Sequence, residues 1–392
     1  MRLLALAALA ASLAAHAQTV PARGDAATFD VAAWNVEHFG NTRGGFGPSD
    51  DARQQANVLA VMEQADIDLW ALQEIGDADA FQDLLDGLAD DGYQGVLGPP
   101  TPGSFQLRLA FVYDASVVTV LGLNEVLPGT NFGGRDPYEL QARVAVGGTS
   151  RTIRVIDIHA KAGTGADDYD KRAAGAVELK AYVDARIARG ESVIVLGDLN
   201  DFLTRSTRSG RPSPYAAFLA DEDYVAATLP VEQAGQPTLC GNSSCTSGST
   251  RDHLLFTADL SAQYVEGSGD RYGELIGAVS GYTFSTSDHL PVLARFSFLS
   301  TASEPAPGPL ALAVGPNPLG DRATLRFHLA EPARVEVDVT DALGRRVWSA
   351  SEASGAGGQS LALPSAAWAP GVYVVRLRAG DVTASRVVVR GR

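Results

Sequence analysis

The sequence predicts an α/β domain followed by a small all-β domain, and three observations support this division. From Phe29 to Phe298, short apolar runs bounded by turn residues alternate with stretches of helical spacing, as in a layered α/β domain. A Pro-rich polar linker follows at 300–309. Over 310–392, apolar and polar residues alternate with period two, which predicts a β-sandwich. We therefore assign the α/β domain to 29–299.

Two periods distinguish the elements expected within the α/β domain. Apolar residues recur with helical spacing over Asp51–Gln64 and Lys171–Arg189, so both stretches predict amphipathic helices. Short apolar segments bounded by turn residues predict strands; they lie at 29–36, 68–75, 107–114, 151–160, 192–200 and 253–260.

The first residues predict a secretory signal peptide over 1–17. One Arg precedes an apolar run from Leu3 to Ala15, and small residues at Ala15 and Ala17 mark a cleavage point after Ala17. The run is too short to span a membrane, and no other segment is long and apolar enough. We expect a mature protein outside the cytoplasm, without membrane insertion.

The net charge of −15 is unevenly spread. Since residues 300–392 carry +2 and residues 1–28 carry +1, the segment 29–299 holds −18. Such a domain lacks the basic surface on which binding to phosphate polymers usually rests. A phosphate substrate must then be attracted locally, by a metal ion and a few Arg side chains. The simpler interpretation is an acidic, solubilising surface.

Cys240 and Cys245 are the two cysteines of the chain. In an oxidising compartment they can close a small disulfide loop. Two free thiols remain the alternative. A metal site is less favoured because no further Cys or paired His lies nearby in the sequence.

Six segments in order resemble the endonuclease/exonuclease/phosphatase superfamily, with secreted bacterial nucleases as the nearest wording. They are WNVEHFG (34–40), LQEIGD (72–77), RLAFVYD (108–114), IDIHAKAG (156–163), GDLND (197–201) and SDHLPV (287–292), with RDHLLF (251–256) before the last. The resemblance implies a four-layer α/β/β/α sandwich and a hydrolase acting on phosphoric ester bonds. It also implies a divalent cation, Mg²⁺ or alternatively Mn²⁺ or Ca²⁺.

Carboxylate and amide side chains at strand ends are the expected metal and substrate groups. Glu74 ends an apolar strand, where a carboxylate can leave the core, and is the best candidate metal ligand. The resemblance adds Asn35 and Asp288 near the metal. It also places Asn35, Arg135 and Asn200 at the substrate phosphate.

Five residues are expected to carry the acid–base chemistry. Asp198 and Asn200 follow an apolar run and share one side of its end; we expect Asp198 to orient or activate the water and Asn200 to donate to phosphate. His289 can exchange a proton near neutral pH, with Asp252 fixing its tautomer. The resemblance makes His159 a second donor to the phosphate or leaving group. The partner of His159 is unidentified, Tyr113 is expected in the core, and His38 and His253 are unassigned.

Residues 310–392 resemble the C-terminal sorting domain of type IX secretion cargo. The resemblance rests on GPNP (315–318), ATLRFHL (323–329), a run over 335–347 and a run over 369–389. It implies delivery through outer-membrane secretion machinery to the cell surface or medium. A generic fibronectin-like module is the alternative.

Three functions fit these patterns. A secreted nuclease acting on DNA or RNA, as a monomer, is favoured by the motif wording. A phosphodiesterase or phosphatase for phospholipid headgroups or small phosphates is the alternative, because the same fold serves both. A non-catalytic surface binding module is the third, and the complete set of site residues argues against it.

Overall fold

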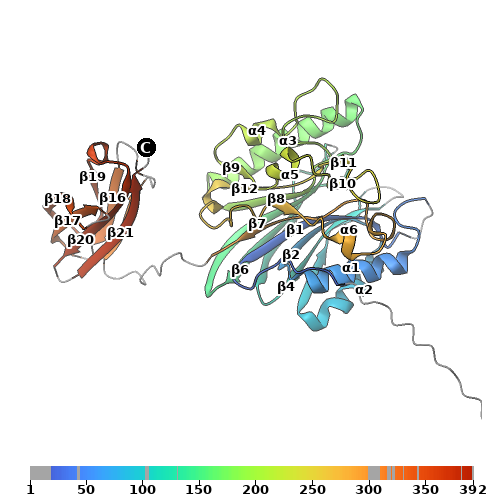
Figure 1. Cartoon of the computed structure of the whole chain (residues 1–392), viewed down its shortest axis with the longest axis horizontal. Helices are drawn as coiled ribbons and strands as arrows, with labels where there is room; N and C mark the ends of the chain where they lie inside the picture. Colours follow the sequence, from blue (N-terminus) through green and yellow to red (C-terminus); the bar gives the residue numbers. More distant parts are fainter. Residues whose placement is uncertain are drawn as a thin grey trace, which may run out of the picture. The chain divides into compact units, whose positions relative to one another are not determined.

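A computed structural model describes residues 19–41, 45–101, 106–129, 131–298, 310–315, 319, 323–329, 331–341, 344–380 and 382–390. The chain divides into two compact units, with the boundary between Leu299 and Ser300. Figure 1 shows the fold of each unit. The expected signal peptide (1–17) and linker (300–309) lie outside the described residues.

Two six-stranded sheets form the centre of the first unit. In order across the first sheet, the strands are β13 (Asp270–Arg271), β14 (Val292–Phe296), β1 (Phe29–Phe39), β2 (Leu69–Ile75), β4 (Arg108–Asp114) and β3 (Tyr93–Leu97). The second sheet runs β5 (Val118–Glu125), β6 (Tyr138–Val146), β7 (Thr149–His159), β8 (Ser192–Asp198), β12 (Asp252–Thr257) and β9 (Tyr224–Ala226).

Helices cover the outer face of each sheet, which completes the predicted four-layer α/β/β/α sandwich. Helices α1 (Asp51–Ala65) and α2 (Ala78–Leu88) pack with one face of β1 and β2 in a single apolar cluster. Helix α3 (Ala166–Ile187) packs with β7 and β8 in another. A third cluster, which includes Phe29, Leu140, Phe256 and Phe296, lies between the sheets.

Several predicted boundaries were wrong, and helix α2 was among the elements that the sequence analysis missed. Helix α3 begins five residues earlier than predicted, because Asp167 and Asp168 favour the positive end of the helix dipole and Asp168 accepts from the backbone N–H of Gly165. The strand predicted over 253–260 ends at Thr257 and continues as a 3₁₀ turn. Helix α2 begins after Asp77, whose carboxylate caps its first turn.

Side-chain alternation explains why the site lies where it does. In β7, Ile153 and Val155 face the core between the sheets, and the same alternation places His159 on that side. In β8 the residues of this face are Ile194, Leu196 and then Asp198. The inner faces of β7 and β8 thus change from apolar to polar at one end of the second sheet.

A short hairpin covers this end. Strands β10 (Leu239–Cys240) and β11 (Gly248–Ser249) pair, and a disulfide joins Cys240 to Cys245, as one of the two sequence alternatives predicted. The hairpin also binds the segment around His289: the backbone N–H of Cys240 donates to Asp288 (2.7 Å), and that of Leu290 donates to Thr238 (2.7 Å).

The second unit is the predicted all-β domain. A three-stranded sheet, β15 (Leu310–Gly315), β16 (Ala323–Leu329) and β19 (Gly357–Leu363), shares an apolar core with a four-stranded sheet. The latter contains β18 (Arg346–Ser354), β17 (Ala333–Asp341), β20 (Gly371–Ala379) and β21 (Val382–Arg390). None of the helices in the described part of the chain is long and apolar enough to cross a membrane.

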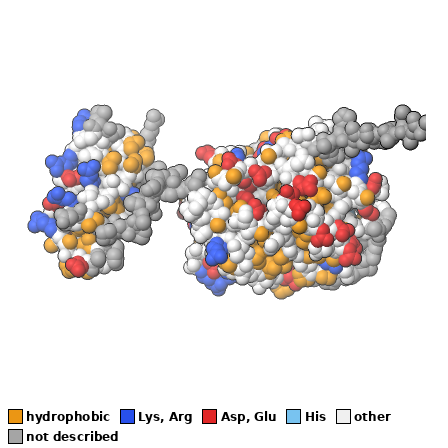
Figure 2. Space-filling model, turned by 90° about the horizontal axis from the view of Figure 1, so that it is seen from below, with side chains coloured by type: hydrophobic (Ala, Val, Ile, Leu, Met, Phe, Trp, Pro, Cys, Tyr) orange, Lys and Arg blue, Asp and Glu red, His pale blue; other side chains and the backbone are white. Residues whose placement is uncertain are grey.

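The charge of the two units differs on the surface as it does in the sequence. In the view of Figure 2, Lys and Arg side chains gather on the second unit, and Asp and Glu side chains form several groups on the visible face of the first. The predicted acidity of the first unit is therefore a surface property.

Candidate active site

A break in strand geometry positions the first half of the site. The pairing between β1 and β2 shifts register between Asn35 and Phe39. Glu37, His38 and Glu74 have positive φ angles of 45°, 54° and 66°. Such conformations are costly for residues other than Gly and concentrate at functional sites. They turn the Glu74 carboxylate toward Asn35, whose Nδ2 donates to it at 3.0 Å.

Asp198 lies at the centre of the second half. Its Oδ2 accepts hydrogen bonds from Asn35 Nδ2 (3.2 Å) and Asn200 Nδ2 (3.1 Å). The Nε2 of His159 lies 3.5 Å from the same oxygen. Asn35 donates to Glu74 as well, so it connects the two sheets across the site. The amide of Asn200, expected at phosphate, is directed at Asp198 and at the carbonyl of Ala160 (3.1 Å).

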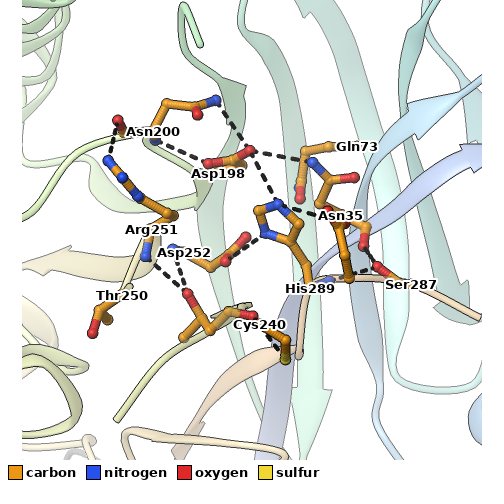
Figure 3. Close-up of polar contacts among 12 residues, drawn as sticks. Asn35, Gln73, Asp198, Asn200, Cys240, Thr250, Arg251, Asp252, Ser287 and His289 are labelled. Carbon is orange, nitrogen blue, oxygen red and sulfur yellow. Dashed lines mark hydrogen bonds and ion pairs between the residues drawn. The ribbon is translucent and has the colours of Figure 1, made fainter. Parts of the chain in front are cut away.

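A buried His–Asp pair completes the constellation (Figure 3). His289 Nδ1 and Asp252 Oδ2 are 2.8 Å apart, and His289 Nε2 lies 4.0 Å from Asp198 Oδ2. The Ser287 hydroxyl accepts from the His289 backbone N–H, and Tyr282 donates its hydroxyl to the His289 carbonyl. These contacts leave Nε2 of the imidazole directed toward Asp198.

The two site histidines have opposite electrostatic environments. Burial lowers the pKa of His289, but the charges of Asp252 and Asp198 more than offset this and hold its pKa well above the ordinary value. Burial and the charge of Arg135 hold the pKa of His159 well below it. Divergent pKa values in one site are typical of acid–base pairs with different roles. These opposite shifts favour the charged form of His289 and the neutral form of His159.

The carboxylates of the site crowd one another in a way that a divalent cation relieves. Burial raises the pKa of Asp198 to about 7, with Asp252 and Glu74 adding repulsion and His289 opposing it. Burial and the charge of Asp288 raise the pKa of Glu37 to about 8. Hard divalent cations take oxygen ligands, so this donor set fits one.

Asp198, Asp252 and His289 form a compact group of side chains of the types that bind metal ions. Ligand atoms of Asp198, Asp252 and His289 all lie within 4.8 Å of one another. The Asp252–His289 hydrogen bond uses the Nδ1 atom, so Asp252 orients the ring and leaves Nε2 directed toward Asp198. Asp288 lies beside this pair, with Oδ1 3.9 Å from His289 Nε2.

Arg135 lies at the edge of the site. Its Nε and Nη2 donate to the backbone carbonyls of His159 (3.2 Å) and Ala160 (2.8 Å). Burial lowers the pKa of its guanidinium, while the charges of Glu74 and Asp198 raise it. A phosphate bound near Asp198 therefore meets a half-buried cation.

Three supporting contacts escaped the sequence analysis because they join distant segments. The carboxylate of Glu37 accepts from the backbone N–H of Asp288 (2.8 Å). Gln73 Nε2 donates to the buried Asp157 (2.7 Å) beneath the site. The second Asp of GDLND, Asp201, forms a fully buried ion pair with Arg172 (3.0 Å). A polar residue on an inward-facing strand position was the one available signal, and it applies to Gln73 and Asp157.

The residues left aside in the sequence also find places. Tyr113 is 7% exposed in the core between the sheets, as predicted. His253 is fully buried on the opposite face of β12 from Asp252, with Nε2 3.2 Å from the Asp201 carbonyl. His38 contacts Glu74, with Nε2 3.3 Å from its Oε2. Glu74 Oε1 also lies 3.6 Å from the Nε2 atom of His159.

Comparison with known families places both units. Residues 32–289 match the Endonuclease/Exonuclease/phosphatase family, and residues 313–390 match the secretion system C-terminal sorting domain. The chain belongs to the endonuclease/exonuclease/phosphatase family. It is therefore a hydrolase of phosphoric ester bonds, in a family that depends on divalent metal ions. The sorting domain indicates type IX export to the cell surface or beyond.

Solved structures show the same fold at low identity. An endonuclease/exonuclease/phosphatase from Beutenbergia cavernae is 17% identical over 92% of this chain and 99% of that one, with a TM-score of 0.50. A 3′ phosphatase from Neisseria, bound to a product DNA hairpin, is 17% identical over 68% and 99%, also with a TM-score of 0.50. The human Nocturnin catalytic domain is 17% identical over 69% and 94%, with a TM-score of 0.46. No curated protein matches the sequence.

Proposed function

We propose that the protein is an exported nuclease that hydrolyses DNA or RNA with a divalent cation, Mg²⁺ before Mn²⁺ or Ca²⁺. The observation that carries the proposal is the meeting of two electrostatically different histidines at Asp198, with Nε2 distances of 3.5 and 4.0 Å. A carboxylate that accepts a proton, a charged imidazole that donates one and a neutral imidazole that donates a hydrogen bond, all close together, are parts that ester hydrolysis uses. The Neisseria relative, bound to product DNA, supports nucleic acid as the polymer.

Glu74, Asn35 and Asp288 would hold the cation, with Glu37 behind Asp288. When bound, the cation neutralises charge on the phosphate and on the attacking water. Asp198 orients that water through the oxygen that faces His159 and His289. Asp198 accepts the proton that this water loses, and His289, protonated and oriented by Asp252, donates a proton to the phosphate or the leaving oxygen. His159, neutral and buried, donates to the phosphate or the leaving oxygen, and Arg135 and Asn200 bind the phosphate oxygens.

The direct test uses the secreted full-length protein on plasmid DNA, RNA, sphingomyelin and bis(4-nitrophenyl) phosphate. We expect nicking or RNA cleavage that chelator abolishes. Glu74→Gln should remove nearly all turnover and leave the thermal unfolding unchanged, since the mutation alters one carboxylate at a strand end. Full activity in strong chelator contradicts the metal role.

The rival function is hydrolysis of phospholipid headgroups or small phosphates. The charge of −18 over residues 29–299 favours it over contact with a long polyanion. Rates that rise when substrate is presented in bilayers, with no cleavage of DNA or RNA, would establish the rival. A third outcome, binding without turnover of any of these esters, fits a non-catalytic module.

The signal peptide over 1–17 and sorting domain over 310–392 are proposed to act in sequence, across the inner and then the outer membrane. The secretion machinery is then the one protein partner, and the enzyme works as a monomer. Deletion from Thr301 onward should keep the rate on bis(4-nitrophenyl) phosphate and stop surface delivery. A truncated chain that folds but fails to turn over would assign the tail a part in the site.

A further inference from the structure

A cavity of about 260 Å³ lies beside the catalytic site, lined by residues within 98–101 and 107–109 on one side and within 125–129 and 134–138 on the other. Sites for drug-sized ligands measure roughly 300–1,000 Å³, so this one suits a single ring system better than a run of polymer. The residues that line the cavity include Pro99, Leu107, Leu109, Glu125, Arg135 and Asp136.

Arg135 connects the cavity to the site. Arg135 lines the cavity, and its guanidinium donates to the carbonyl of His159. Burial lowers the pKa of this guanidinium, and the charges of Glu74 and Asp198 raise it. A substrate with its phosphate beside Asp198 therefore has the cavity next to that phosphate. The group attached to the phosphate can enter it while Arg135 contacts the phosphate oxygens.

The cavity has an apolar side and an acidic side. Leu107 and Leu109 offer a surface for a flat ring. Glu125 and Asp136 supply carboxylates that lie close enough for Asp136, together with burial, to raise the pKa of Glu125. Two carboxylates repel a second phosphate. They accept hydrogen bonds, as Glu and Asp do from the amino group of cytosine.

We propose that this cavity binds the nucleobase attached to the scissile phosphate and selects bases that carry an exocyclic amino group. The inference rests on the proposed nuclease function and adds a substrate preference to it. Cytosine, adenine and guanine present an amino donor to Glu125 and Asp136. At the position of the cytosine amino group, thymine and uracil present a carbonyl oxygen, which the carboxylates repel.

The test compares cleavage of single-stranded oligo(dC) and oligo(dT), with oligo(rC) and oligo(rU) as the RNA pair. We expect kcat/KM to favour the cytosine member by at least about fivefold, the lower end of one good base contact. Glu125→Gln and Asp136→Asn keep the shape and remove the charge. Each should bring the ratio toward one, and the double variant should abolish it.

Two controls distinguish a loss of base preference from a general loss of activity. Hydrolysis of bis(4-nitrophenyl) phosphate, which carries no base, should be unchanged in all three variants. Asp90→Asn makes the same charge change on an exposed residue of the 3₁₀ turn Ala89–Asp91 and should leave the cytosine preference intact. Binding of dCMP and dTMP by calorimetry gives a readout independent of turnover, with the same order expected.

The outcomes are distinguishable. Equal rates on the cytosine and thymine or uracil substrates in the wild type overturn the base pocket and leave the nuclease standing. Hydrolysis of the generic diester with no cleavage of any oligonucleotide contradicts the nuclease itself. A choline phosphodiester hydrolysed in preference to its uncharged analogue, with the preference lost in Glu125→Gln, would overturn the inference by assigning the acidic side to a cationic headgroup.

Discussion

At the residue scale, the amide of Asn35 and the carboxylate of Asp252 organise the site. Asn35 holds Glu74 and Asp198 together through a single nitrogen, and Asp252 sets both the orientation and the charge of His289. Neither side chain needs to touch the substrate to control the chemistry. Substitutions that preserve shape and change charge are therefore the informative ones.

Asp252→Asn tests the His–Asp pair. The amide cannot stabilise the imidazolium, so we expect kcat to fall by roughly 10²–10⁴-fold, the usual contribution of a positioned acid or base. The far-UV spectrum and melting temperature should change little, because the buried position keeps a polar group of the same size. Asp259→Asn, on the 3₁₀ turn after β12, is the control. A rate within threefold of wild type would show that Asp252 does not act through His289.

Sequence patterns predicted the end-of-strand residues and missed their supports for a physical reason. Asp198, Asp252 and His289 follow or begin apolar runs, so alternation alone directs them inward. Gln73 meets Asp157 only through the packing of one sheet on the other. The bulge that turns Glu74 depends on backbone angles that its residue type disfavours. Local preference does not encode such positions.

At the element scale, Asp30 of β1 and Asp68, which directly precedes β2, form an acidic contact at the end opposite the site; Asp30 is buried and Asp68 half-buried. The backbone N–H of Asp30 donates to Asp68 at 2.8 Å. Burial raises the pKa of Asp68 to about 8, with Asp30 and Asp114 adding repulsion, and burial raises the pKa of Asp30 to about 6. The folded protein thus holds protons that the unfolded chain has released.

The sign of the resulting pH dependence follows from linkage. Between the ordinary pKa of 3.8 and about 8, folded Asp68 binds more protons than unfolded Asp68, so stability falls as pH rises through this window. Asp68→Asn keeps the acceptor for Asp30 and should raise the melting temperature at pH 8, with little change at pH 4. Glu266→Gln, an exposed charge, should raise it at neither pH. An unchanged pH profile would mean that Asp68 stays ionised.

The disulfide hairpin is the second element with a testable role. It holds the backbone on both sides of His289, and Thr238 within it accepts from the Asp252 backbone N–H (3.0 Å). Cys240→Ser with Cys245→Ser should cost about 2 kcal/mol, the chain-entropy value for so short a loop. It should lower kcat at least about tenfold and KM little, because the hairpin positions His289 and not the substrate. Equal activity of reduced and oxidised enzyme would contradict this role.

At the scale of the whole molecule, the charge distribution bears on how the proposed nuclease would bind a polymer. The catalytic unit carries −18, and its acidic groups are visible at the surface (Figure 2). Local attraction by the cation and Arg135 must therefore replace the basic surface found in most nucleic-acid enzymes. The all-β tail could be predicted from the sequence, since its period-two alternation is a local pattern; the signal peptide over 1–17 stays a prediction.

A salt series measures this balance. The logarithm of affinity falls with the logarithm of salt in proportion to the phosphates neutralised, so we expect a slope no steeper than about −2 for plasmid binding. Nicking should persist at salt that stops a basic nuclease, and Arg135→Ala should make the slope shallower still. A steep slope would show that the enzyme has a cationic surface that the sequence does not predict.

The two-sheet construction has a consequence for variation in the family. Asn35 and Glu74 belong to one sheet, whereas His159, Asp198 and Asp252 belong to the other. The thickness of the apolar layer between them, filled by Phe29, Phe256 and Phe296, fixes the gap that Asn35 bridges. A change of side-chain volume in that layer alters the distance between the catalytic residues of one sheet and those of the other. Reaction rates can thus drift between relatives whose catalytic residues are identical.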